Sequence, residues 1–250
     1  MNRYGLLGHK LSHSLSPVIH NYLFKKNNID GIYELIEIEE EMLPLYVEKV
    51  RNGTYIGLNV TIPYKEKIIP YLDELSQASL AIGAVNTIYL KDGKVIGDNT
   101  DYLGFIDELN EYNINVKDKN VYILGSGGAS KAISYAMKIL GANPIIVSRD
   151  NSIGITYDEL KDIKHYSLII NTTPVGMYPN CDKEILDKDT VLKSDLCVDI
   201  ICNPKVTKLL EYAKEGYNGI LMLVFQAIRA EILWQEKEIK YDLKELLELL

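Results

Sequence analysis

Four short polar stretches in the first half of the chain contain the residue types that hold a small polar molecule and move a proton. They are Ser12–Pro17, Asn59–Lys65, Gly83–Thr87 and Gly97–Asp101. Closely spaced hydroxyl groups ahead of a helix can hold a carboxylate without adding a charge. A lysine ammonium can stabilise negative charge on an oxygen atom and give it a proton. The four stretches are therefore candidates for parts of one polar binding site.

The stretch from Asn59 to Lys65 carries the lysine. Asn59 and Thr61 are two residues apart on a predicted strand, so both side chains lie on one face. Lys65 follows within one turn of the end of that strand. Read alone, each polar residue also has a structural explanation, because Asn86 fits a turn, Asp101 fits the first turn of a helix, and lysines are usually solvated.

A glycine loop in the middle of the chain is the clearest local motif. The buried strand Val121–Leu124 leads into Gly125–Gly128, and the helix Ala129–Leu140 follows. Glycine allows a pyrophosphate to approach the backbone, and the start of the helix supplies N–H donors and partial positive charge. Ser130 replaces the third glycine of the GxGxxG fingerprint. The strand and helix on either side favour a dinucleotide site over a simple tight turn.

The end of the next strand reads Ser148-Arg149-Asp150 and bears on the choice of cofactor. The forked donors of Arg149 suit the 2′-phosphate of NADP. Asp150 could instead accept a hydrogen bond from a ribose 2′-hydroxyl group, which would favour NAD. We expect NADP, with NAD as the alternative.

Together these stretches resemble the shikimate dehydrogenase family. The early serine pair of the family is matched by Ser14 and Ser16, and its strand motif by Asn59–Lys65. Its remaining motifs are matched, in the family's order, by Gly83–Thr87, Asp98–Asp101, Gly125–Ala129, Asn171–Met177 and Met222–Ala227. The resemblance covers nearly the whole chain, and the joint order of the motifs is far more specific than any one of them.

The resemblance implies an NADP-dependent oxidoreductase of the shikimate pathway of aromatic amino acid biosynthesis, which reversibly reduces 3-dehydroshikimate to shikimate. It implies that Lys65 protonates the developing alkoxide and acts as the base in the reverse direction, while Asp101 pairs with Lys65 and binds a ring hydroxyl. Two alternatives are a quinate/shikimate dehydrogenase that uses NAD and a non-catalytic sensor of shikimate-like metabolites. The presence of both Lys65 and Asp101 disfavours the sensor, because binding alone does not require a proton donor.

The resemblance also implies binding residues on both sides of the site. The carboxylate pocket is formed by Ser14, Ser16 and Thr61, with Asn59 supporting that face. The ring hydroxyls are bound by Asn86, Asp101 and Gln226. The cofactor is bound by Gly125, Ser126, Gly127, Gly128, Ala129, Arg149, Ile200 and Gly219.

Three positions depart from the family pattern. Cys202 stands where the family commonly has a substrate-binding tyrosine, and a thiol is a poorer donor than a phenol. We therefore expect a weaker grip on the substrate carboxylate or a substitute donor. Asp150 stands where NADP-dependent members often have threonine, and Tyr102 where many have glycine.

The elements that position these residues alternate between strands and helices, which is typical of βαβ units and parallel sheet. Strands are predicted at Tyr4–Gly8, Ile32–Ile38, Tyr55–Ile62, Thr87–Leu90, Lys94–Ile96, Val121–Leu124, Pro144–Ser148, Leu168–Asn171 and Leu196–Ile201. Helices are predicted at Pro17–Lys26, Glu40–Arg51, in segments toward Leu80, from Thr100 to before Val116, and at Ala129–Leu140, Lys205–Lys214, Met222–Lys237 and Leu243–Leu250. Asp92-Gly93 between two strands predicts a hairpin.

We expect an α/β fold with two domains. The pattern places a boundary near Gly97–Tyr102 and leaves the terminal helices unassigned. The resemblance assigns residues 1–100 and 219–250 to an N-terminal α/β substrate-binding domain. It assigns residues 101–218 to a C-terminal Rossmann-like NADP-binding domain, with the active site in the cleft between the two.

Composition excludes several classes of function. The net charge of −8 and the sequence pI of about 5.1 argue against binding to nucleic acid. The three cysteines lie outside any CxxC or Cys/His cluster, so we expect no metal site and a reducing compartment. No apolar stretch approaches the roughly 18 residues that suggest a membrane span. We therefore expect a cytoplasmic protein, monomer or homodimer, whose partner is its small-molecule substrate.

Overall fold

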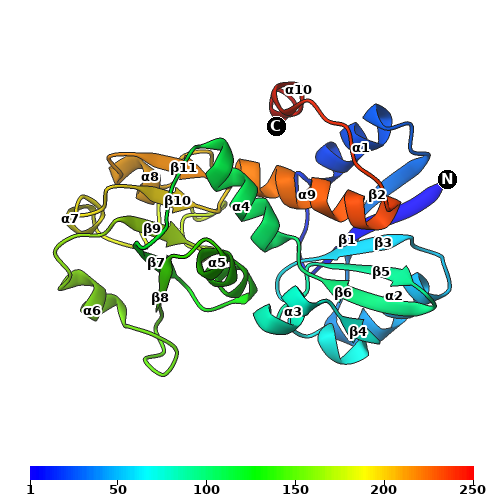
Figure 1. The fold of residues 1–250 in the computed structure, drawn as a ribbon, viewed down its shortest axis with the longest axis horizontal. Coiled ribbons are helices and arrows are strands. Elements are labelled where there is room, and N and C mark those ends of the chain that lie inside the picture. The colour runs from blue at the N-terminus through cyan, green and yellow to red at the C-terminus, as the bar shows by residue number, and fades with distance from the viewer. The chain divides into compact units, whose positions relative to one another are not determined.

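The computed structural model describes all 250 residues and divides the chain into two compact units. The first unit comprises Met1–Gly104 and Val224–Leu250, and the second comprises Phe105–Leu223. Each unit contains one β-sheet with helices packed on it, so the predicted α/β fold class is confirmed (Figure 1). Two helices run from one unit into the other, α4 (Asp101–Glu111) and α9 (Ile220–Gln235).

The first unit is built on a six-stranded sheet in the order β2-β1-β3-β5-β6-β4. Its strands are β1 (Asn2–Gly8), β2 (Gly31–Glu37), β3 (Gly57–Val60), β4 (Glu74–Leu75), β5 (Thr87–Lys91) and β6 (Lys94–Asp98). Strands β2, β1 and β3 are parallel, whereas β5 is antiparallel to both of its neighbours. The antiparallel pair is the predicted hairpin, and its turn residues Asp92 and Gly93 have φ of 50° and 76°, as such a turn requires.

Helices cover both faces of this sheet. They are α1 (Ser16–Lys26), α2 (Leu43–Arg51), α3 (Gln77–Ile82), α10 (Leu243–Leu247) and the short 3-10 helices Glu40–Met42 and Ile69–Tyr71. The successive residues Leu6 and Leu7 belong to different apolar clusters, which therefore lie on opposite faces of β1. One cluster includes residues of α2, and the other includes Trp234 of α9.

The second unit is built on a five-stranded parallel sheet in the order β11-β10-β9-β7-β8. Its strands are β7 (Asn120–Leu124), β8 (Asn143–Val147), β9 (Leu168–Asn171), β10 (Cys197–Asp199) and β11 (Gly216–Asn218). Its further helices are α5 (Gly128–Ile139), α6 (Tyr157–Lys161), α7 (Lys188–Val191) and α8 (Lys208–Tyr212). A single parallel bridge joins Ile155 to Val147 at the outer edge of β8. Counted as a rudimentary strand, Ile155 completes the Rossmann order 3-2-1-4-5-6.

Several predicted elements differ from the structure. The helical segments expected toward Leu80 are interrupted by the short strand β4, and the helix expected over Lys205–Lys214 is confined to Lys208–Tyr212. Strand β11 and helices α6 and α7 had no predicted counterpart. These elements are only three to five residues long, so their hydrophobic periodicity is too short to read.

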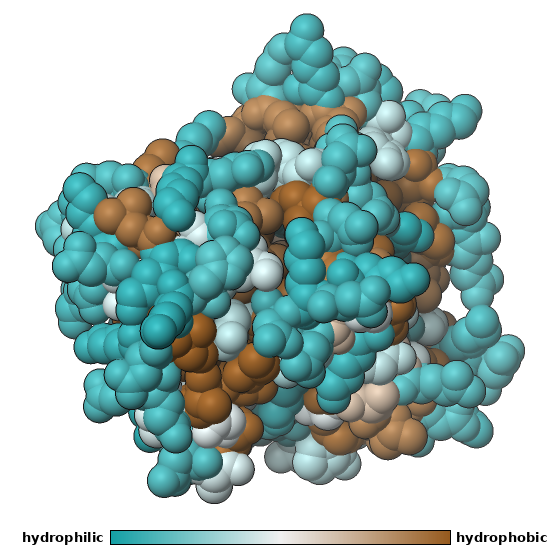
Figure 2. Space-filling model, turned by 60° about the vertical axis from the view of Figure 1, so that its left-hand side comes forward, coloured by the Kyte–Doolittle hydropathy of each residue, from teal (hydrophilic) through white to brown (hydrophobic).

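Hydrophilic side chains dominate the face shown in Figure 2, where hydrophobic side chains form separate small patches. None of the helices combines the length and the apolar character needed to cross a bilayer.

Candidate active site

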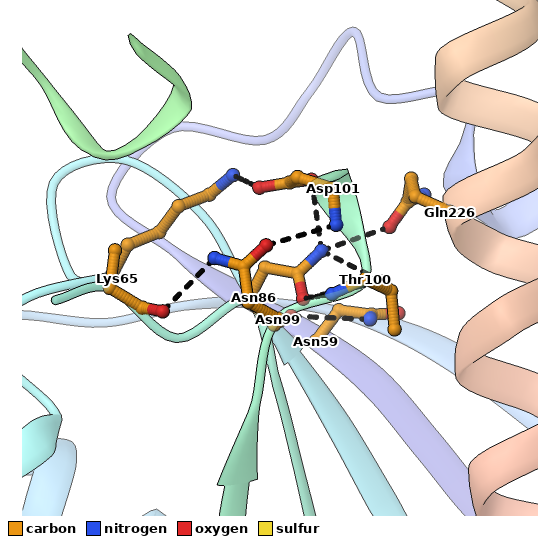
Figure 3. Close-up of polar contacts among 8 residues, drawn as sticks. Asn59, Lys65, Asn86, Asn99, Thr100, Asp101 and Gln226 are labelled. Atoms are coloured by element: carbon orange, nitrogen blue, oxygen red, sulfur yellow. Dashed lines mark hydrogen bonds and ion pairs between the residues drawn. The ribbon is translucent and has the colours of Figure 1, made fainter. Parts of the chain in front are cut away.

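Lys65 and Asp101 form an ion pair in the first unit. Lys65 Nζ lies 2.6 Å from Asp101 Oδ2, and the side chains are 14% and 7% exposed. Lys65 belongs to the turn that follows β3, where Tyr64 N–H donates to Thr61 O. Val85 N–H donates to Lys65 O at 2.7 Å and fixes the backbone of the lysine. A nearly buried ammonium group is therefore held against a carboxylate at the start of α4 (Figure 3).

Asn86 connects this pair to α4 and α9. Its Nδ2 lies 2.9 Å from Asp101 Oδ1 and 3.4 Å from Gln226 Oε1. Its Oδ1 accepts from Thr100 N–H at 2.7 Å. Residues from three separate motifs thus point toward one another (Figure 3), and Asn86 and Asp101 are both buried.

Local backbone geometry brings the motifs together. Gly83 has φ of +72° and ends α3 in the left-handed conformation, which glycine adopts most easily. Asn86 N–H then donates to Asp98 O as the chain enters β5. Asn99 Nδ2 donates to Ala84 O at 3.0 Å and ties the two polar motifs side by side.

Asn59 lies beneath the same network. The hydroxyl of Tyr33 donates to Asn59 Oδ1 at 2.7 Å, and Asn59 Nδ2 donates to Asn86 O at 3.3 Å. Asn59 is 4% exposed, whereas Thr61, just beyond the end of β3, is partly exposed. Thr61 N–H donates to Leu7 O, so its backbone continues the pairing with β1.

Ser14 and Ser16 lie at the start of α1. Ser14 Oγ accepts from Ser16 N–H at 3.3 Å, and the N-cap residue of the helix is Leu15, which has no side-chain cap. Neither serine hydroxyl therefore caps the helix in the usual way. Ser16 is 6% exposed.

The glycine loop of the second unit joins β7 to α5. Gly125 has φ of +111°, and an added Cβ would lie 2.8 Å from Thr172 Oγ1. Gly127 is the N-cap residue of α5, no side chain caps that end, and an added Cβ there would meet open space. Ser130, which replaces the third glycine, donates to Gly125 O at 2.7 Å and braces the loop.

Arg149 and Asp150 follow β8 and are both exposed. Asp150 Oδ1 accepts from the N–H and the hydroxyl of Ser152 at 2.9 and 2.7 Å. These hydrogen bonds lower the pKa of Asp150. The guanidinium of Arg149 is accessible to an anion, because the residue is exposed.

Ile200, which follows β10, and Gly219, which follows β11, lie close together. An added Cβ on Gly219 would lie 2.5 Å from Ile200 Cα, so the glycine is needed for this close approach. Cys202 is two residues further along, with Sγ 3.8 Å from Ile200 O. Burial raises the pKa of the Cys202 thiol to about 12, with a smaller contribution from the negative charge of Glu108. The thiol is therefore protonated and is a weak donor.

Comparison with known proteins identifies the family. The family model for the shikimate dehydrogenase substrate binding domain matches residues 6–88. Shikimate dehydrogenase (NADP(+)) of Clostridium beijerinckii is 45% identical over 94% of this chain and 93% of its own. The chain belongs to the shikimate dehydrogenase family.

Solved structures of family members agree with this assignment. Shikimate dehydrogenase 1 from Peptoclostridium difficile is 39% identical, with a TM-score of 0.89 and complete coverage of both chains. Shikimate 5-dehydrogenase from Thermus thermophilus, in complex with NADP(H) and shikimate, is 29% identical, with a TM-score of 0.91 and coverage of 100% of this chain and 98% of that one.

The residues of the second unit fit a dinucleotide. The uncapped start of α5 offers free N–H donors, and the open space before Gly127 allows a phosphate to approach. Loop residues Gly125, Ser126, Gly128 and Ala129 lie within the same turn and first helical residues.

Some residues of the site were not singled out from the sequence. Asn99 and Thr100 are members of a recognised motif, but their roles follow from contacts with Ala84 and Asn86. Tyr33 lies in a predicted strand and had no signal of its own. The structure contains no group of three His, Cys, Asp or Glu side chains that could hold a metal ion.

Proposed function

We propose that this chain catalyses the reversible NADPH-dependent reduction of 3-dehydroshikimate to shikimate, as an enzyme of the shikimate pathway. The observation that carries the proposal is the Lys65–Asp101 pair at 2.6 Å, joined through Asn86 to Gln226. The 45% identity to a relative named Shikimate dehydrogenase (NADP(+)) supports the same conclusion.

In this proposal Lys65 moves the proton. The ammonium gives a proton to the ketone oxygen as that oxygen gains negative charge, and Lys65 takes the proton back when shikimate is oxidised. A bound nicotinamide would supply or accept the hydride. Asp101 holds Lys65 Nζ in place and accepts a hydrogen bond from a ring hydroxyl, while Asn86 orients Asp101 through its 2.9 Å contact.

We assign the remaining polar side chains of the first unit to substrate binding. The carboxylate would be held by neutral donors, since Ser14, Ser16 and Thr61 bring no charge into the pocket. Asn59 supports that face, and Gln226 joins Asn86 in binding ring hydroxyls. From the second unit, Cys202 would contact the substrate weakly because its thiol is a poor donor.

We assign the second unit to the cofactor. The pyrophosphate would lie at the start of α5, cradled by the residues Gly125, Ser126, Gly127, Gly128 and Ala129. Ile200 and Gly219 would lie beside the nicotinamide. Arg149 would pair with the 2′-phosphate, and NADP is favoured because the carboxylate of Asp150 is already bonded to Ser152.

We propose that residues 1–100 and 219–250 form the substrate-binding domain and residues 101–218 the NADP-binding domain. A monomer or homodimer in the cytoplasm is expected, and the state of assembly can be measured by light scattering.

The proposed reaction is tested by absorbance at the nicotinamide band, with shikimate and NADP, then with NAD and with quinate. We expect rapid reduction of NADP by shikimate. Lys65→Ala should lower kcat by about a hundredfold or more, the range in which general acid catalysis contributes. Lys67→Ala is the matched control, because Lys67 is an exposed lysine two residues away that pairs with Glu40.

Each other result would redirect the proposal. Comparable turnover with NAD or quinate would move the chain to the quinate/shikimate dehydrogenases. Tight binding of shikimate without turnover would support a metabolite sensor. Equal losses in Lys65→Ala and Lys67→Ala would contradict the role of Lys65.

A further inference from the structure

A buried His–Glu pair is linked to Asn59 through Tyr33. His20 of α1 and Glu231 of α9 are both 0% exposed, and His20 Nδ1 lies 2.6 Å from Glu231 Oε1. Glu231 Oε2 accepts from Gln235 Nε2 at 3.1 Å. A hydrogen bond therefore joins the two side chains, while His20 Nε2 is buried without a partner. None of the proposed catalytic or binding roles uses this pair.

Aromatic rings enclose the imidazole. The ring of Tyr33 stacks on His20 with centroids 4.0 Å apart and an interplanar angle of 7°. Trp234 stacks on it at 5.4 Å, and Phe24 lies at 6.3 Å. Glu231 sets the rotation of the imidazole, and the imidazole in turn leaves Tyr33 one position for its ring.

The hydroxyl of Tyr33 decides which end of the Asn59 amide faces the site. It donates to Asn59 Oδ1 at 2.7 Å, so Nδ2 must point the other way, where it donates to Asn86 O. The second N–H of Nδ2 then remains as a donor. Were the amide turned round, its oxygen would face the pocket and repel an anion.

We propose that Glu231, His20 and Tyr33 form a brace that positions Asn59 as a donor to the substrate carboxylate. The brace runs through contacts between α9, α1, β2 and β3, and all three of its side chains are buried. Its members are positioning residues, because they act through Asn59. The proposal rests on the proposed function, since it names the group on shikimate that the brace serves.

The test compares shikimate with its methyl ester in steady-state kinetics. Tyr33→Phe should raise the KM for shikimate about tenfold, the loss expected for about 1.4 kcal/mol of hydrogen bonding, with kcat and the KM for NADP nearly unchanged. The KM for the ester should rise much less, because the ester lacks the anionic charge. Tyr55→Phe is the matched control, since Tyr55 is also a buried tyrosine, 4% exposed, but its hydroxyl accepts from Arg3.

Two substitutions of Glu231 distinguish an effect on the position of Asn59 from a general loss of packing. Glu231→Gln keeps an oxygen that can accept from His20 Nδ1, so the KM for shikimate should stay near the wild-type value. Glu231→Leu should raise it, and adding Tyr33→Phe should raise it no further, because both changes act on Asn59. If Tyr33→Phe leaves the KM for shikimate unchanged, or raises it no more than Tyr55→Phe does, the brace has no such role. Wild-type protein that does not oxidise shikimate would instead refute the proposed function.

Discussion

The buried carboxyl group of Glu108 should make the second unit less stable as pH rises. Glu108 is 0% exposed, its Oε2 accepts from Met222 N–H at 2.7 Å, and its Oε1 has no partner. Burial raises its pKa from the ordinary 4.5 to about 8, against the opposing effect of the Met222 hydrogen bond. Folding therefore favours the protonated acid.

The sign and size of the effect follow from this difference in pKa. A pKa that is higher in the folded than in the unfolded chain gives stability that is complete below pH 4.5 and is lost as pH rises toward about 8. At about 1.4 kcal/mol for each pKa unit, the full loss is about 5 kcal/mol. About 3 kcal/mol of it falls between pH 6 and 9.

Glu108→Gln removes the ionisation and keeps an oxygen that can accept from Met222 N–H. The variant should gain stability relative to wild type as pH rises, by about 3 kcal/mol between pH 6 and 9. Urea unfolding followed by far-ultraviolet circular dichroism measures this, because the single tryptophan, Trp234, lies in the first unit. Glu111→Gln, an exposed change on the same helix, is the control.

Parallel stability curves for wild type and Glu108→Gln across this pH range would refute the argument. They would mean that Glu108 is ionised in the folded chain, or that water reaches it. A pH-dependent gain in Glu111→Gln of the same size would show that general charge repulsion on the acidic chain is the cause instead.

Three further substitutions test other features of the structure. Gly57→Ala should cost about 2–3 kcal/mol of stability, because the new Cβ would lie 2.2 Å from Trp234 Nε1; unchanged urea unfolding would contradict this. Gly127→Ala should leave stability nearly unchanged but raise the KM for NADP about tenfold, because the new Cβ enters the open space before α5. An unchanged KM for NADP would argue against a pyrophosphate at this position. Cys202→Tyr should lower the KM for shikimate severalfold by supplying a stronger donor, and an unchanged KM would show that Cys202 does not weaken substrate binding.

Elements whose geometry is dictated by local residue type could be predicted from the sequence. The Asp92-Gly93 turn needs positive φ at both positions, and the structure has it. The strand Leu168–Asn171 was predicted with the bounds that the structure shows, because it is a continuous apolar run ended by polar residues. The glycine loop likewise lies between a buried strand and a helix.

Elements that depend on distant contacts could not be predicted in this way. The predicted helix from Lys205 begins instead at Lys208, after Thr207, whose hydroxyl donates to the buried carboxylate of Asp199 at 2.6 Å. Burial raises the pKa of Asp199 to about 6, and the hydrogen bonds that the carboxylate accepts oppose this rise. Because the Thr207 hydroxyl is bonded to Asp199, it does not cap the helix. The local sequence gives no sign of this hydrogen bond.

The candidate site also contains both kinds of feature, those set by local sequence and those set by distant contacts. The motifs that contain Lys65, Asn86 and Asp101 could be recognised because each has several polar residues at short spacing, and the structure brings those side chains into contact. The pair formed by His20 and Glu231 is 211 residues apart in sequence, and each residue alone resembles an ordinary helix residue. Burial of both side chains at 0% exposure is costly even with their mutual hydrogen bond, because His20 Nε2 has no partner. The pair packs against Tyr33, which donates to Asn59, in a place where apolar packing would serve stability as well. The cost of keeping it there is the strongest argument that the pair serves the proposed site.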